Sequence, residues 1–123
     1  MSYAKTKGRN AETLVAQYLS EQFGLDVDRR RQKGSNDEGD ISGLRIANYD
    51  FVVEVKDHKA DAWSEMVTET EEEIVNRQVA KPKLCVLGFA VRKKAGTLDV
   101  GDWYAVTKMR QMARIIQQLE GTK

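Results

Sequence analysis

Hydrophobic and polar residues alternate along the chain in patterns that predict both helices and strands. Apolar residues recur at helical spacing in three ranges, 9–23, 62–79 and 108–119. Apolar or β-branched runs predict strands at 25–27, from Asp40 onward, and at 49–55, 83–91 and 103–106. The order helix, three strands, helix, two strands, helix predicts an α/β domain with a mixed central β-sheet of about five strands flanked by helices.

The strand that ends near Lys56 joins a strongly apolar sequence to two charged residues. Because side chains alternate across a strand, Phe51, Val53 and Val55 would point into a core. Val52, Glu54 and Lys56 would share the other face. A carboxylate and an ammonium group would therefore lie side by side on a central strand, where charges are seldom buried unless they are paired or bound to metal.

Asp40 would join these two charges. A hairpin through residues 43–48 would place it beside Glu54. Two neighbouring carboxylates repel unless a dication neutralises them, and Mg²⁺ prefers oxygen ligands. Lys56 could then orient water or stabilise charge on a phosphate. The alternative is a surface ion pair between Glu54 and Lys56 on an edge strand.

The last two predicted helices carry apolar stripes that we expect to pack on the sheet. In the 62–79 helix the stripe contains Trp63, Met66, Val67, Ile74 and Thr70, and its glutamates at positions 69 and 71–73 are expected to face solvent. In the 108–119 helix the stripe comprises Met109, Met112, Ala113, Ile116 and Leu119, which predicts a core or dimer contact.

Composition limits the class of protein. With 123 residues, 41% hydrophobic content and one proline, the chain is expected to form a single folded domain spanning 1–123. The absence of a membrane-length apolar run or a signal-like start predicts a cytoplasmic protein with no membrane partner. Cys85 lies in an apolar run and is expected to be a buried, reduced thiol. No zinc pattern is present.

Positive charge is unevenly distributed, although the net charge is only +1. Residues 1–33 carry seven basic and four acidic side chains. The basic residues form two clusters that could contact DNA phosphates or simply line a charged surface. They are Lys5, Lys7 and Arg9 in the first cluster and Arg29, Arg30, Arg31 and Lys33 in the second.

Several residues in the first half of the chain follow the order and spacing of a known nuclease type. They are Gly8 and Glu12 on the first helix, an arginine ahead of Gly34 and Ser35, then Asp40, Glu54 and Lys56. This set resembles the restriction-endonuclease-like nucleases of the PD-(D/E)XK type, and most closely the archaeal-type Holliday junction resolvases. Gly39 differs from that pattern, because the family often has proline there.

The resemblance implies a role for each matching residue. Asp40, Glu54 and the backbone carbonyl of Val55 would bind Mg²⁺, with Mn²⁺ as the alternative ion, and Lys56 would be the catalytic lysine. Glu12 would complete the site through water. Ser35 would lie near the scissile phosphate, preceded by Arg30, with Arg29 and Arg31 as alternatives to Arg30.

The predicted function is that of a Mg²⁺-dependent endodeoxyribonuclease, a Holliday junction resolvase with no small-molecule cofactor. A four-way junction is cut at two symmetric positions, so a homodimer is expected. The same motif would also fit a repair or restriction-type nuclease acting on flaps, ends or duplex. A non-catalytic DNA-binding subunit with this fold is a third alternative. Action in the cytoplasm, including that of a virus-infected host, fits each of these.

Overall fold

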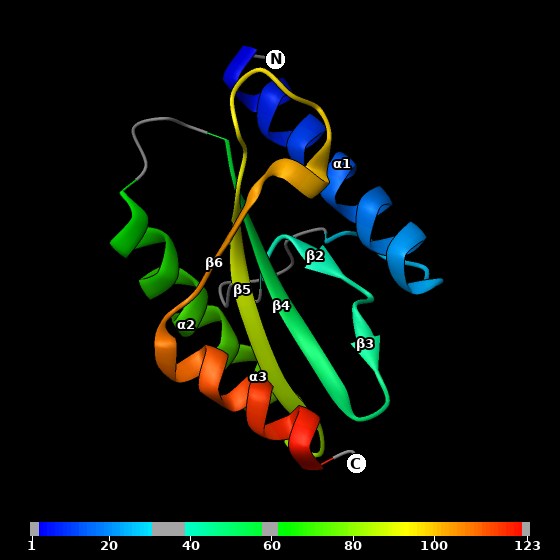
Figure 1. Cartoon of the computed structure of the whole chain (residues 1–123), viewed down its shortest axis with the longest axis vertical. Helices are drawn as coiled ribbons and strands as arrows, with labels where there is room; N and C mark the ends of the chain where they lie inside the picture. Colours follow the sequence, from blue (N-terminus) through cyan, green and yellow to red (C-terminus); the bar gives the residue numbers. More distant parts are fainter. Residues whose placement is uncertain (1–2, 31–38, 58–61, 122–123) are drawn as a thin grey trace.

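The computed structural model of the chain describes residues 3–30, 39–57 and 62–121 (Figure 1). Its elements, in chain order, are α1 (Tyr3–Phe23), β1 (Asp28–Arg29), β2 (Ile41–Ser42), β3 (Arg45–Ile46), β4 (Tyr49–Lys56), α2 (Trp63–Ala80), β5 (Cys85–Arg92), the 3₁₀ helix η1 (Val100–Asp102), β6 (Tyr104–Val106) and α3 (Met109–Gly121). In the described part of the chain, no helix is both long enough and apolar enough to cross a membrane.

The central sheet has the strand order β3-β4-β5-β6, with β4 and β5 parallel and the outer pairs antiparallel. A second, two-stranded sheet pairs β1 with β2. Residues on either side of β2 also lie along β4, because Asp40 N–H donates to Val53 O at 3.0 Å and Phe51 N–H donates to Leu44 O at 3.0 Å. The predicted α/β class with a mixed sheet is confirmed.

Helices cover both faces of this sheet, with α1 on one side and α2 and α3 on the other (Figure 1). Val53 and Val55 belong to the core under α1, whereas Val52 packs with Ile74 of α2 and with Val86. The alternation predicted for β4 is therefore confirmed. The face that carries Glu54 and Lys56 is the face that α2 covers, and this places both charges beneath a helix.

Residues 25–27 do not form the predicted first strand, which instead occupies Asp28–Arg29. Ser20 of α1 satisfies both backbone hydrogen-bonding groups of Val27: its Oγ donates to Val27 O and accepts from Val27 N–H, both at 3.0 Å. Val27 is also buried in the α1 core. Because Ser20 already satisfies these backbone groups, pairing with β2 begins one residue later, at Asp28.

Arg77 joins α2 to the central sheet. Its side chain is buried, and it donates from Nη1 to Phe51 O at 3.0 Å and from Nη2 to Ile41 O at 3.3 Å. Nη1 also lies 3.6 Å from Asp50 Oδ1, so the two buried side chains form an ion pair. The pair fixes α2 against β4 and against the start of β2.

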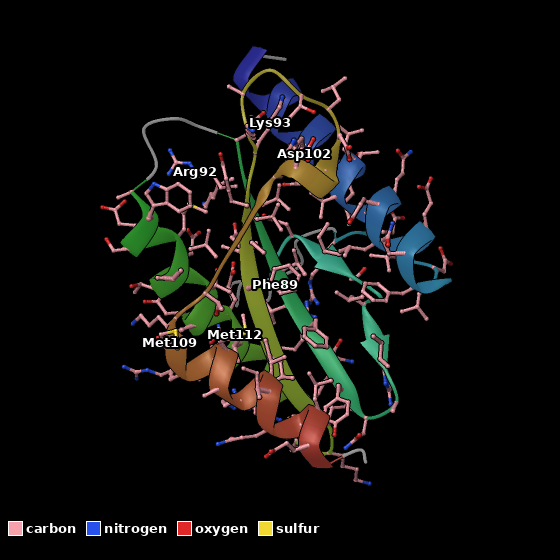
Figure 2. All side chains as sticks on the ribbon, in the orientation of Figure 1. Phe89, Arg92, Lys93, Asp102, Met109 and Met112 are labelled. Atoms are coloured by element: carbon pink, nitrogen blue, oxygen red, sulfur yellow. The ribbon has the colours of Figure 1, made fainter. Side chains whose placement is uncertain are left out.

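The apolar stripe predicted for the last helix does not face the core. Met109 is 81% exposed and Leu119 is 64% exposed, and Figure 2 shows Met109 and Met112 at the start of α3. Gln111 is buried instead, and Arg114 donates to Val86 O at 3.2 Å. The interpretation of this stripe as core is wrong, because polar side chains of α3 make the contact with the sheet.

Candidate active site

Asp40 is held beside β4 by two backbone contacts. Its own N–H binds Val53 O, and its carboxylate oxygen Oδ2 accepts a hydrogen bond from Val55 N–H at 2.8 Å. Glu54 lies between these two residues on β4. The nearby Asp40 carboxyl is among the groups that raise the pKa of Glu54. The structure therefore brings the two predicted carboxylates together.

Gly39 adopts a backbone conformation that only glycine accepts easily. Its φ is +97°, and a Cβ at this position would lie 2.9 Å from Val52 Cγ1. Proline, which the resemblance leads one to expect here, has its φ fixed near −65°. The departure from the family pattern thus has a conformational reason, and it leaves Asp40 in position.

Helix α2 adds two carboxylates to the site. Carboxylate oxygens of Glu54, Glu69 and Glu73 all lie within 4.8 Å of one another, and Glu73 is only 1% exposed. The interpretation of the α2 glutamates as a solvated face is therefore wrong for Glu69 and Glu73. It fits the exposed Glu72 better, while Glu71 lies 3.1 Å from Lys108.

A signal for Glu73 was present in the sequence. The buried positions of α2 include Met66, Thr70, Glu73 and Arg77, which recur at intervals of three and four residues. This spacing marks one helix face. A glutamate and an arginine on the same stripe as a methionine indicate buried charges rather than a solvated surface.

Glu54 is strongly perturbed by this environment. The residue is 4% exposed, and its Oε2 is buried and makes no hydrogen bond within the described residues. Burial, together with the neighbouring carboxyl groups of Glu73 and Asp40, raises the pKa of Glu54 from its ordinary value of 4.5 to about 12. The folded protein therefore holds this carboxyl group protonated at neutral pH when no cation is bound.

Lys56 is held by carboxylates from two elements. Its Nζ lies 3.0 Å from Glu69 Oε2 on α2 and 3.5 Å from Glu54 Oε1 on β4. Burial alone would lower the pKa of Lys56, but the hydrogen bond to Glu69 outweighs it and raises the pKa, helped by the negative charge that Glu54 gains in the high pH range where Lys56 itself titrates. Lys56 is thus a fixed cation beside the acidic cluster.

The donor set at this site is compatible with a hard divalent cation. Its potential ligands are carboxylate oxygens, which are suitable ligands for Mg²⁺ and Mn²⁺. The buried Glu54 Oε2 with no hydrogen-bond partner is an acceptor that a cation could satisfy. Binding of Mg²⁺ or Mn²⁺, and the role of the Val55 carbonyl as a ligand, remain predictions.

The other predicted site residues make contacts apart from this cluster or lie outside the described residues. Glu12 Oε2 is 4.0 Å from Arg29 Nη1, and Arg30 N–H donates to Asp40 O at 2.6 Å. Ser35 lies outside the described residues, as do Arg31 and Lys33, and so do the side chains of Lys5, Lys7 and Arg9. The contacts of these residues with DNA remain predictions.

Comparison with known proteins identifies a matching family. No curated protein and no solved structure matches the chain. A family model described as "Phage putative PDDEXK endonuclease" matches residues 3–81, which is more than half of the 123 residues. The matched range contains Asp40, Glu54 and Lys56 as well as the acidic residues of α2. The chain therefore belongs to this phage family of PD-(D/E)XK endonucleases.

Proposed function

We propose that the protein is a Mg²⁺-dependent DNA endonuclease that hydrolyses phosphodiester bonds, with four-way junctions as its substrate. The observation that carries the proposal is the convergence of Asp40, Glu54 and Lys56 on one strand and the chain segment beside it. The preference for four-way junctions derives from the resemblance to Holliday junction resolvases. It can be tested separately from the nuclease activity.

Asp40 and Glu54 would hold the cation, together with the Val55 carbonyl, and the α2 carboxylates would complete its surroundings. A bound Mg²⁺ supplies Lewis-acid activation of water and neutralises charge on the phosphate. The hydrogen bond from Val55 N–H fixes the orientation of the Asp40 carboxylate beside β4. Glu12 would act from α1 through water.

Lys56 would act as a cation. Because its pKa is raised, it keeps its proton at neutral pH and cannot serve as a general base in this environment. Its compact ammonium group would bind a phosphate oxygen and stabilise negative charge that develops during hydrolysis. Glu69 would hold the ammonium group in place between substrate and β4, since it makes the shorter of the two contacts.

A homodimer would match two symmetric cuts in a four-way junction. The exposed apolar stripe of α3 supports this part of the proposal, because four large apolar residues on one helix remain uncovered in the single chain. They are Met109, Met112, Ile116 and Leu119. A second copy of the chain that packs against this stripe would bury it.

The test is a cleavage assay on labelled four-way junction, flap and linear duplex with and without Mg²⁺. Wild-type protein should cut only with the metal. Asp40→Asn and Glu54→Gln should lose cleavage but still bind the junction, whereas Glu65→Gln, on the exposed first turn of α2, should cut normally. Equal cutting of linear duplex would contradict the junction preference and favour a restriction-type or repair nuclease. Binding without any metal-dependent cutting would favour a non-catalytic subunit.

A further inference from the structure

Three neighbouring strands place a row of side chains beside the candidate active site. Lys56 on β4 pairs with Arg92 on β5, and Arg92 pairs with Tyr104 on β6. Directly paired residues project from the same face of a sheet. Arg92 and Tyr104 therefore lie on the face that carries Lys56 and that α2 covers.

Trp63, the first residue of α2, packs against this row. The guanidinium carbon of Arg92 lies 4.5 Å from the centroid of the Trp63 ring. The rings of Trp63 and Tyr104 meet edge to face, with centroids 5.8 Å apart and an interplanar angle of 63°. Figure 2 shows Arg92 close to the first turn of α2. We refer to Trp63, Arg92 and Tyr104 as the aromatic–arginine cluster.

This cluster is not explained by core packing. Trp63 is 47% exposed and Tyr104 is 45% exposed, although Trp63 was expected to be part of the buried α2 stripe. The second tryptophan, Trp103, is a core residue, since it is buried and its indole N–H donates to Thr97 O at 3.0 Å. The aromatic–arginine cluster thus presents ring surface to solvent, with the half-buried Arg92 guanidinium against the Trp63 ring.

The distance from Lys56 to the cluster indicates which part of a bound DNA strand the cluster could contact. Adjacent strands lie about 4.8 Å apart, so the backbone of Arg92 is about 5 Å from that of Lys56 and the backbone of Tyr104 is about 10 Å away. A DNA strand whose phosphate lies at Lys56 would therefore bring the neighbouring nucleotide within reach of the cluster. Lys93, next to Arg92, is not part of the cluster, since its Nζ lies 3.7 Å from Asp57 Oδ1 and 5.8 Å from the centroid of the Trp103 ring.

We infer that the aromatic–arginine cluster binds an unpaired nucleobase of the DNA strand next to the cleavage position, by stacking on Trp63 and Tyr104. Stacking on aromatic side chains and arginine is available to every base and needs a base that is free of its duplex partner. This inference rests on the proposed function and adds a substrate class to it. DNA with unpaired nucleotides near the cut should be preferred to continuous duplex.

Binding without metal tests the stacking site independently of cleavage. In a chelator, a labelled single-stranded thymidine oligonucleotide should bind Trp63→Leu about 5- to 150-fold more weakly than wild type, because stacking contributes about 1–3 kcal/mol per base. Trp63→Phe keeps an aromatic ring and should retain most of the affinity. Phe23→Leu is the matched control, since Phe23 is half exposed at the end of α1, on the opposite face of the sheet. Equal binding by wild type and Trp63→Leu would overturn the inference, as would an equal loss in Phe23→Leu.

Cleavage separates this inference from the proposed function. With Mg²⁺, Trp63→Leu should lose activity on a duplex carrying unpaired nucleotides near the cut and keep its activity on the fully paired duplex. Asp40→Asn should lose both. If wild type and Trp63→Leu cut both substrates equally well, the stacking site is wrong while the nuclease stands. If no protein cuts but oligonucleotide binding depends on Trp63, the nuclease is wrong while the stacking site stands. Circular dichroism and thermal unfolding check that each variant is folded.

Discussion

The protonation of Glu54 leads to a prediction about stability in the absence of metal. In the folded protein the pKa of this buried carboxyl group is about 12, whereas in the unfolded chain its pKa has the ordinary value of 4.5. Between these values the folded state binds one more proton than the unfolded state. The stability that the proton provides is complete below pH 4.5 and is lost progressively as the pH rises toward 12.

The magnitude follows from proton linkage. One proton of difference changes the free energy of unfolding by on the order of 1 kcal/mol for each pH unit. Between about pH 5.5 and about pH 8, the metal-free protein should therefore lose about 3 kcal/mol of stability. Glu54→Gln has nearly the same shape but cannot ionise. Its advantage over wild type should be small below about pH 4.5 and should grow by about 3 kcal/mol between about pH 5.5 and about pH 8.

The assay is urea unfolding in a chelator at several pH values, with Glu65→Gln as a control whose carboxylate was exposed. Glu65→Gln should follow the wild-type pH dependence. Added Mg²⁺ should stabilise wild type near pH 8 and have little effect on Glu54→Gln, because a ligand that binds only the folded state raises its stability. A Glu54→Gln curve parallel to that of wild type would refute the reasoning, because another group would then cause the pH dependence.

Three further predictions concern the frame of the site and the α3 surface. Arg77→Leu should lower the free energy of unfolding by about 3–5 kcal/mol, because it leaves the buried Asp50 without its cation. Adding Asp50→Asn to the same chain should restore part of this stability, as measured by denaturant titration. Gly39→Ala should cost about 1–3 kcal/mol through its φ of +97° and should slow cleavage by shifting the following aspartate; unchanged cleavage would contradict this. Ile116→Glu should shift sedimentation from dimer to monomer, whereas Gln117→Glu adds the same charge and should leave the dimer intact; a wild-type monomer would contradict the interface.

The sequence was most informative on the strand that carries the site. Side-chain alternation along a strand has a period of two residues, so the faces of Val53 and Glu54 followed once the strand was recognised. The short distance along the chain from Asp40 to Glu54 left few ways to connect them other than a hairpin. Both predictions depend on local geometry alone.

The helices were harder to predict because an amphipathic pattern does not identify what covers it. The apolar residues of α3 form a clear stripe, yet α3 contacts the sheet through side chains such as Gln111 and Arg114. On α2, Glu73 and Arg77 are buried because Glu54 and Asp50 lie opposite them on β4. The spacing along the helix could place both residues on its buried stripe, but it could not identify their partners, because the pairing is a tertiary contact.

The most direct test of the central claim is a calorimetric titration of Mn²⁺ into the metal-free protein, with Asp40→Asn measured alongside. Asp40 and Glu54 meet at one position in the fold, and a cation held between them should give saturable binding to wild type that is lost, or weakened at least about tenfold, in the variant. Equal affinity of the two proteins for Mn²⁺, or no binding to wild type, would contradict the claim.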